Sequence, residues 1–229
     1  MNVNRWSLHA VKYNVQEITI IIEQLHNSPY KIPHPLLNCE SLRKLRIQVF
    51  NTPRYVDMIL PRSMNLPQLE KLTIRGLSIS NLEFSKRLFS SCPVLETLST
   101  LHSNVLTDNP RSLIIDSLSL KKFLYTCWHG HRFPQNDTTA NVIKLCAPNL
   151  EDFFCCFFLA QDYSLEISSP LYRVRFEMRV DAKEEEDEDA ETYEELPPKE
   201  KGVYARRTMK FLRAVSMVTE MGLSSSFLE

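Results

Sequence analysis

The stretches Leu42-Arg43-Lys44-Leu45-Arg46-Ile47 and Leu69-Glu70-Lys71-Leu72-Thr73-Ile74 follow one pattern. An apolar residue is followed by two variable residues, a second apolar residue, one variable residue and a third apolar residue. Related stretches recur along the chain, with first residues Val15, Leu42, Leu69, Leu95, Leu120, Leu150, Leu171 and Val218. The steps between these residues are 27, 27, 26, 25, 30, 21 and 47. Near-regular spacing of this kind indicates an internal structural repeat rather than chance amphipathicity.

Proline marks the approach to several copies of the repeat. It stands two residues before Leu69, Leu95 and Leu150, and directly before Leu171. Proline is tolerated at the start of a strand but not in its middle, so it marks where each coil turns inward. Five of the steps lie within the period of about 20–29 residues that is typical of leucine-rich repeats. We therefore expect residues 1–229 to form a single α/β leucine-rich-repeat solenoid of about eight irregular coils.

Side-chain alternation within each strand predicts which residues are buried. Successive side chains of a strand point to opposite faces, so Leu45 and Ile47 point into the core and Arg46 points out. Stacked coils pair these strands into a parallel sheet on the concave face, and irregular helices and loops form the convex face. We expect short helices there within 84–89 and 207–212.

The central outward position of each strand is the predicted site of partner binding. The residues at that position are Thr19, Arg46, Thr73, Ser99, Leu124, Phe154 and Arg175. Leu124 and Phe154 come from neighbouring coils, so they form an apolar patch, and Lys122 and Asp152 give this patch a polar rim. The alternative is that a loop such as 127–141, or the acidic insertion, folds over the patch and buries it.

The longest step contains an acidic run. The formal net charge is −1, and residues 184–195 hold nine acidic side chains and no basic one, which leaves +8 for the remainder. We expect 181–202 to be a mobile insertion that folding can spare, because it buries too little apolar surface to offset its ordering entropy. A docking strip for a basic partner is the alternative.

The basic remainder raises a second alternative, in which the solenoid binds nucleic acid. Lys44, Arg46, Lys71 and Arg75 would line adjacent strands of the concave face, and phosphate binding needs such clustering. Charged residues at solvent-facing strand positions are the ordinary case, so we favour a protein partner.

The sequence predicts neither catalysis nor a metal or cofactor site. Residues 127–131, Cys-Trp-His-Gly-His, hold potential zinc ligands, but their spacing does not match a structural zinc site. Cys155 and Cys156 are adjacent in a strand, so one is expected in the core and one exposed, with no local base to activate either. The chain also has no G-x-S-x-G, Walker loop, H-E-x-x-H or G-x-G-x-x-G motif. A hydrolase or transferase hidden in the repeats is the enzymatic alternative.

Membrane and secretory signals are also not expected. No apolar run reaches the roughly 18 residues of a membrane helix. The first residues, MNVNRWSLHAVKYN, lack the apolar core of a secretory signal. We therefore expect an intracellular protein, in the cytoplasm, the nucleus or both, with reduced cysteines.

Several phrases resemble the plant F-box/FBD/LRR family. The most specific is Ser91-Cys92-Pro93-Val94-Leu95-Glu96 with its continuation to Leu98, which resembles the S-C-P-x-L-E-x-L phrase of one coil in that family. The stretches 36–42 (LLNCESL), 66–70 (LPQLE), 147–150 (APNL) and 215–224, and the pair Arg5-Trp6, are similar to other parts of its repeat domain.

The resemblance implies a protein-binding scaffold. The scaffold would resemble the substrate-recognition part of an F-box protein in an SCF ubiquitin ligase. Neither the F-box, which binds a Skp-type adaptor in the family, nor the FBD module is evident, so adaptor binding is expected only if an F-box lies upstream. A truncated member that acts only as an interaction module, or a non-functional remnant, is the alternative.

Overall fold

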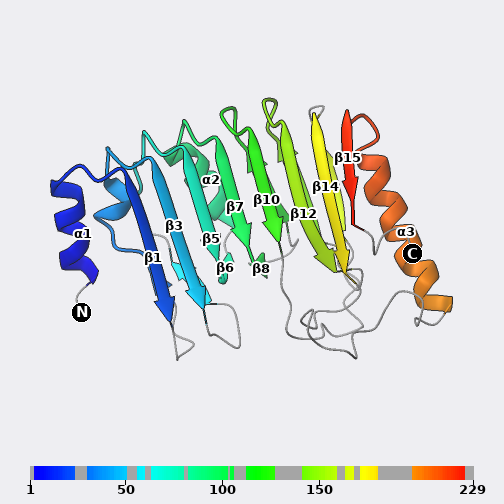
Figure 1. Cartoon of the computed structure of the whole chain (residues 1–229), viewed down its shortest axis with the longest axis horizontal. Helices are drawn as coiled ribbons and strands as arrows, with labels where there is room; N and C mark the ends of the chain where they lie inside the picture. The colour runs from blue at the N-terminus through cyan, green and yellow to red at the C-terminus, as the bar shows by residue number, and fades with distance from the viewer. Residues whose placement is uncertain are drawn as a thin grey trace.

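The computed structural model is an elongated stack of coils (Figure 1). It describes residues 3–23, 30–50, 56–59, 63–79, 82–102, 104–105, 112–126, 141–158, 163–167, 171–179 and 198–224. Eight parallel strands form its main sheet in the order β1-β3-β5-β7-β10-β12-β14-β15. Their bounds are Glu17–Glu23, Lys44–Phe50, Lys71–Arg75, Thr97–Leu101, Lys122–Thr126, Asp152–Phe158, Arg173–Arg179 and Glu220–Leu223. Each strand begins at the third position of one copy of the repeat, so the predicted leucine-rich-repeat solenoid is confirmed.

The inward positions of these strands form one continuous apolar ladder. The fourth repeat position is paired across the sheet from Ile18 to Met221, and all but the last of its members are buried. Phe123 and Phe153 stack with their ring centroids 5.5 Å apart. Met221 is 43 % exposed, because β15 is the last strand of the sheet. Burial of this ladder removes apolar surface from water and holds the coils together.

The backbone repeats one hydrogen-bond motif between coils. The carbonyl of Arg43 accepts the amide N–H groups of Glu70 and Lys71, and the carbonyl of Glu70 accepts those of Glu96 and Thr97. The same double donation recurs at most other steps, from Gln16 to Tyr172. It sets the register in which each strand meets the next, before any side chain is considered.

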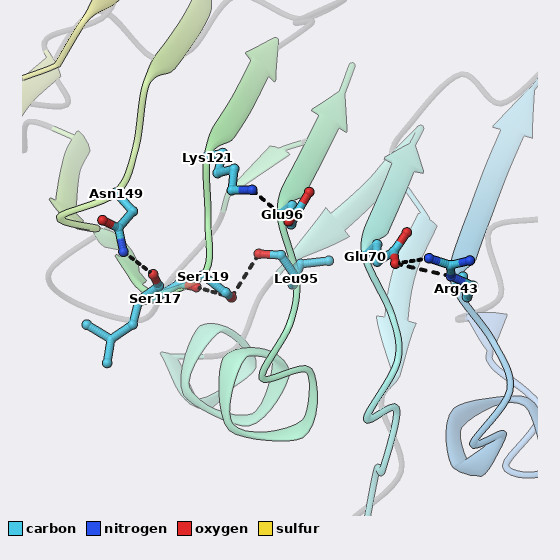
Figure 2. Close-up of polar contacts among 9 residues, drawn as sticks. Arg43, Glu70, Leu95, Glu96, Ser117, Ser119, Lys121 and Asn149 are labelled. Carbon is cyan, nitrogen blue, oxygen red and sulfur yellow. Dashed lines mark hydrogen bonds and ion pairs between the residues drawn. The ribbon is translucent and has the colours of Figure 1, made fainter.

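Side chains reinforce the turns that precede the strands (Figure 2). The Ser119 hydroxyl donates to the Leu95 carbonyl at 2.9 Å, and the Asn149 amide donates to the Leu118 carbonyl at 2.7 Å. The Ser41 hydroxyl makes the equivalent bond to the Val15 carbonyl at 3.2 Å. Polar side chains thus satisfy carbonyls that the irregular turns leave without a strand partner.

The convex face differs from coil to coil. It holds the 3-10 helix η1 (Leu36–Asn38), the helices α2 (Leu82–Ser91) and α3 (Pro198–Ala214), and the strands β9 (Ser112–Asp116), β11 (Asn141–Cys146) and β13 (Tyr163–Ile167). The two expected helices are confirmed within α2 and α3. The three strands form a second parallel sheet, which the sequence analysis did not predict. Alternation explains it, because Ile143 and Leu145 are buried whereas Lys144 between them is exposed.

Short elements complete the stack. The strands β2 (Tyr30–Lys31), β4 (Val56–Ile59), β6 (Leu77–Ile79) and β8 (Asn104–Val105) form a small sheet, and Figure 1 shows β6 and β8 near the ends of β5 and β7. Helix α1 (Val3–Lys12) precedes β1. Asn14, which follows this helix in the chain, has a φ of 51°, and a residue in this left-handed conformation commonly ends a helix.

The bounds of the predicted insertion need one correction. Residues 198–202 form the start of α3, a helix that packs on the core through the buried Phe211. Residues 181–197 lie outside the described residues.

Candidate protein-binding surface

The seven predicted binding residues lie in one row across the sheet. Strand pairing places each beside the next, in the order Thr19, Arg46, Thr73, Ser99, Leu124, Phe154 and Arg175. The eighth strand adds Gly222, which pairs with Arg175 and which the sequence analysis omitted. The repeat pattern supplied the missing signal, because Gly222 occupies the same position relative to Val218 as Arg46 does relative to Leu42. We call this row the outward column.

Exposure varies along the outward column. Thr19, Arg46 and Arg175 are exposed, whereas Thr73, Leu124 and Phe154 are half-buried. Ser99 is only 9 % exposed, so it is not an open contact residue. A serine side chain is shorter than those of its neighbours in register, Thr73 and Leu124, which accounts for its burial.

Leu124 and Phe154 are direct partners in register, as the sequence predicts. The Arg175 guanidinium lies 5.7 Å from the centroid of the Phe154 ring, within the range of a cation–π contact. The half-buried aromatic ring thus lies between Leu124 and the Arg175 guanidinium in the outward column. The loop 127–140, which would cover this patch in the alternative arrangement, lies outside the described residues.

A polar network borders the patch. Lys122 lies 3.5 Å from Asp152, Asp152 lies 3.4 Å from Arg173, and Arg173 donates to Glu220 at 2.6 Å. Hydrogen bonds from Arg173 and from the Tyr172 hydroxyl lower the pKa of Glu220, and the bond to Glu220 raises the pKa of Arg173. Lys122 and Asp152 are the rim residues that the sequence predicts, and the network extends that rim to β15.

Four cations gather on β3 and β5, at the other end of the sheet. Lys44 is paired with Lys71 in register, and Gln48 with Arg75. Lys44 makes an ion pair with Glu17, which lowers the pKa of that carboxyl. The Arg75 guanidinium lies 5.0 Å from the centroid of the Phe50 ring. The concave face is therefore basic near its N-terminal end and apolar near its C-terminal end.

The cysteine pair on β12 differs from the expectation. Cys155 and Cys156 point to opposite faces, but both are buried, and Cys156 is only 6 % exposed. Burial raises the pKa of Cys155 well above its ordinary value, and burial raises that of Cys92 to about 12. A thiol with a raised pKa is a poor nucleophile, because the thiolate is the reactive form.

The described residues contain neither a metal-ligand cluster nor a membrane-spanning helix. Within the described part of the chain, no group of three or more His, Cys, Asp or Glu side chains could hold a metal ion. The Cys127–His131 segment lies outside that part. The helices that the structure describes include none that is long and apolar enough to cross a bilayer.

Comparison with known proteins gives a consistent result. The sequence model described as "FBD-associated F-box protein At5g56370, LRR repeats" matches residues 3–169. The chain is 28% identical over 182 residues to the F-box/LRR-repeat protein At3g59210 of Arabidopsis thaliana, a stretch that covers 77% of this chain and 32% of the relative.

Two further Arabidopsis thaliana proteins show the same relation. The FBD-associated F-box protein At5g56370 is 24% identical over 63% of this chain and 33% of its own length. The F-box/LRR-repeat protein At1g55660 is 27% identical over 72% of this chain and 42% of its own length. The chain thus spans roughly a third to two-fifths of these relatives. No solved structure matches it.

Proposed function

The chain belongs to the leucine-rich-repeat family of the FBD-associated F-box proteins, and on that premise we propose that its concave face selects a protein partner. The observation that carries this proposal is the outward column. It brings an aromatic and an aliphatic side chain together in register, with Arg175 stacked beside them and an ion-pair network at their border. An apolar centre within a polar rim is the usual anatomy of a protein interface.

The biological context of this selection is also a proposal. The family resemblance implies that such proteins present substrates to an SCF ubiquitin ligase. In that role the F-box contacts a Skp-type adaptor, and the repeats bind the substrate. In that arrangement the repeats recognise the substrate and do not contact the adaptor. Residues 1–229 would then act as the recognition part, and ubiquitin transfer would need an F-box on the same polypeptide.

Site-specific photocrosslinking tests the proposed face. A benzophenone amino acid is placed at Thr73 or at Arg175, both on the outward column, and at Lys144 on the convex sheet as the matched control. In a plant cell extract, we expect the two concave positions to crosslink to one shared protein that Lys144 does not reach. Equal crosslinking from Lys144, or none from the concave positions, would contradict the proposal.

A second experiment tests the ligase context. The repeats, alone and fused to the F-box of a relative, are mixed with purified Skp-type adaptor. We expect adaptor binding only by the fusion, and ubiquitination of the crosslinked partner only when the fusion and the assembled ligase are both present. Direct adaptor binding by the repeats alone would show that the division of labour is wrong.

A further inference from the structure

The charge pattern of the strand pairs has one exception among the described residues. Six register pairs join two charged residues, and five of these combine opposite charges. The five are Glu17–Lys44, Lys122–Asp152, Asp152–Arg173, Arg173–Glu220 and Lys144–Glu166, and each is also an ion pair. The sixth is Lys44–Lys71, which places two like charges side by side.

Like charges directly opposite each other on neighbouring strands destabilise a sheet. Lys44–Lys71 is not isolated, because Arg46 and Arg75 lie on the same two strands and point to the same face. Glu17 makes its ion pair with Lys44, and Lys71 has only longer-range attraction to Glu17 and Glu96, whose two carboxylates do not balance the four cations. We call Lys44, Arg46, Lys71 and Arg75 the basic cluster. Its excess positive charge is available to anionic groups of a ligand, and binding of such groups would relieve the repulsion.

The basic cluster lies at a definite distance from the apolar patch. From β5 to β10 is two strand spacings and from β5 to β12 is three, which is about 10–14 Å at roughly 4.8 Å per strand. An extended peptide advances about 3.3–3.6 Å per residue, so three or four residues bridge this distance. The small side chains Thr73 and Ser99 lie between the two regions in the outward column.

From this arrangement we infer that the protein partner presents an acidic segment to the basic cluster and, three or four residues away, a large apolar side chain to Leu124 and Phe154. The inference rests on the proposed function and specifies the chemistry of the partner. Acidic side chains provide the charge complementarity, and Leu, Phe or Trp fits the half-buried patch beside the Arg175 guanidinium.

A peptide partner suits this surface better than nucleic acid does. Nucleic-acid affinity grows with the number of phosphates that Lys and Arg side chains neutralise along the backbone. At the C-terminal end of the sheet, Lys122 and Arg173 are ion-paired with Asp152 and Glu220, so these carboxylates offset the positive charge that phosphates would need. The alternation of a cationic and an apolar region is matched by an acidic and apolar peptide.

The test uses the full chain and a set of fluorescein-labelled 14-residue peptides. Each peptide carries an Asp-Glu-Asp-Glu block and one Trp, separated by one to seven Gly/Ser residues. Matched peptides replace the acidic block with Lys or the Trp with Gly, and a 14-nucleotide single-stranded RNA serves as the nucleic-acid probe. Fluorescence anisotropy gives the Kd. We expect the tightest binding at a spacing that places Trp three or four residues from the block, and at least tenfold weaker binding by either matched peptide.

Variants locate the two contacts. Arg46→Glu with Lys71→Glu should weaken the acidic peptides at least tenfold and reduce their salt dependence. Lys144→Glu, on the convex sheet, should leave binding unchanged. Melting curves of all variants show that the fold is retained. Phe154→Ala should weaken peptides with Trp but not those with Gly.

Three outcomes would overturn the inference, and two of them leave the proposed function standing. In the first outcome, peptides bind through Trp and lose affinity with Phe154→Ala, but their affinity does not change with the Glu double variant. This result would support the concave interface and contradict its acidic ligand. RNA that binds more tightly than every peptide, and is lost with the double variant, would reject both. If no peptide binds while the crosslinking experiment identifies a concave partner, the inference alone is wrong.

Discussion

The concave sheet and the convex layer are built from the same coils, yet only the sheet is regular. Phe123 pairs with Phe153 across a step of 30 residues, Phe153 with Val174 across 21, and Val174 with Met221 across 47. The register is unchanged at every step. The variation in step length is accommodated in the convex layer. This layer has a 3-10 helix in one coil, α2 or α3 in others, and three strands between them.

The difference shows where the fold is specified. A one-residue slip in the sheet would move an entire apolar column to solvent, so the register of the sheet is strongly constrained. A convex segment has only to close its loop and contribute apolar side chains to the core. Loop closure becomes only slowly more unfavourable with length, so steps of very different size are compatible with one sheet.

The largest effect is expected in the apolar ladder of the sheet. Phe153 is buried against Phe123, and Phe153→Ala should lower the free energy of unfolding by about 3–5 kcal/mol through lost burial and a cavity. Phe154→Ala, one residue along on the opposite face, should lower it by a small fraction of that. Urea unfolding of both variants measures the difference. Equal losses would mean that Phe154 is also core and that its face is covered.

A substitution at Gly76, where the chain leaves the sheet, is expected to change the free energy of unfolding by a smaller amount. Gly76 follows β5 with a φ of +72°, and a Cβ there would lie 2.3 Å from the Val49 carbonyl oxygen. Gly76→Ala should therefore lower the free energy of unfolding by at least about 1–2 kcal/mol, the strain of a left-handed residue with a side chain.

Gly202 provides the matched control for Gly76. It lies in α3 with open space around it, so Gly202→Ala should raise stability by up to about 1 kcal/mol through helix propensity. Thermal melting of the two variants should thus shift in opposite directions. A shift in the same direction would show that the backbone at Gly76 relaxes or that α3 begins elsewhere.

The same contrast explains how far the sequence could predict the structure. The repeat in the sequence is the period of the sheet, so all eight strands and the outward column from Thr19 to Arg175 could be located. The convex strands β9, β11 and β13 are each only five or six residues long. Their alternation was visible, at Ile143 and Leu145 for example, but a short alternating stretch is weak on its own.

The candidate site was predictable in position but not in detail. The pattern placed Leu124 beside Phe154, because register follows from the repeat. It did not reveal that Ser99 is buried or that Cys156 is covered on its outward face, since both depend on the sizes of neighbouring side chains. The like-charged pair Lys44–Lys71 stands in the sequence, but its significance required the register of every other charged pair.

Removal of an exposed ion pair between neighbouring coils should change the free energy of unfolding by a smaller amount, and this change should appear mainly at acidic pH. Lys121 donates to Glu96 at 2.8 Å, which lowers the pKa of Glu96 below its ordinary value of 4.5 and raises that of Lys121 (Figure 2). A lowered pKa adds stability above pH 4.5, and this stability is lost as the pH falls through the folded-state value. Glu96→Gln should therefore reduce the loss of stability between pH 5 and pH 3.

The matched control for Glu96 is Glu40→Gln, an exposed glutamate in the turn before β3. Urea unfolding at several pH values should show a shallower acid limb for Glu96→Gln than for Glu40→Gln. Both side chains of the pair are 47 % exposed, so added salt should shrink the difference. An identical acid limb in both variants would mean that the pair contributes nothing to the folded state.

The smallest effect on the melting temperature is expected from a deletion within the longest step between repeat copies. Such a deletion directly tests whether the convex layer is less constrained than the sheet. Deleting residues 184–195 removes the acidic run, which lies between the end of β14 at Arg179 and the start of α3 at Pro198. Both flanking elements and the pairing of Val174 with Met221 lie outside the deletion. The melting temperature should stay within a few degrees of the parent value, because no described element loses a residue. Deleting 163–167, which is strand β13, is the control: it removes a convex strand whose Leu165 is buried in the core, and it should lower the melting temperature far more. If the acidic deletion were as damaging as the loss of β13, the run would have to pack as part of a coil. Convex segments would then constrain the register as strongly as the sheet does.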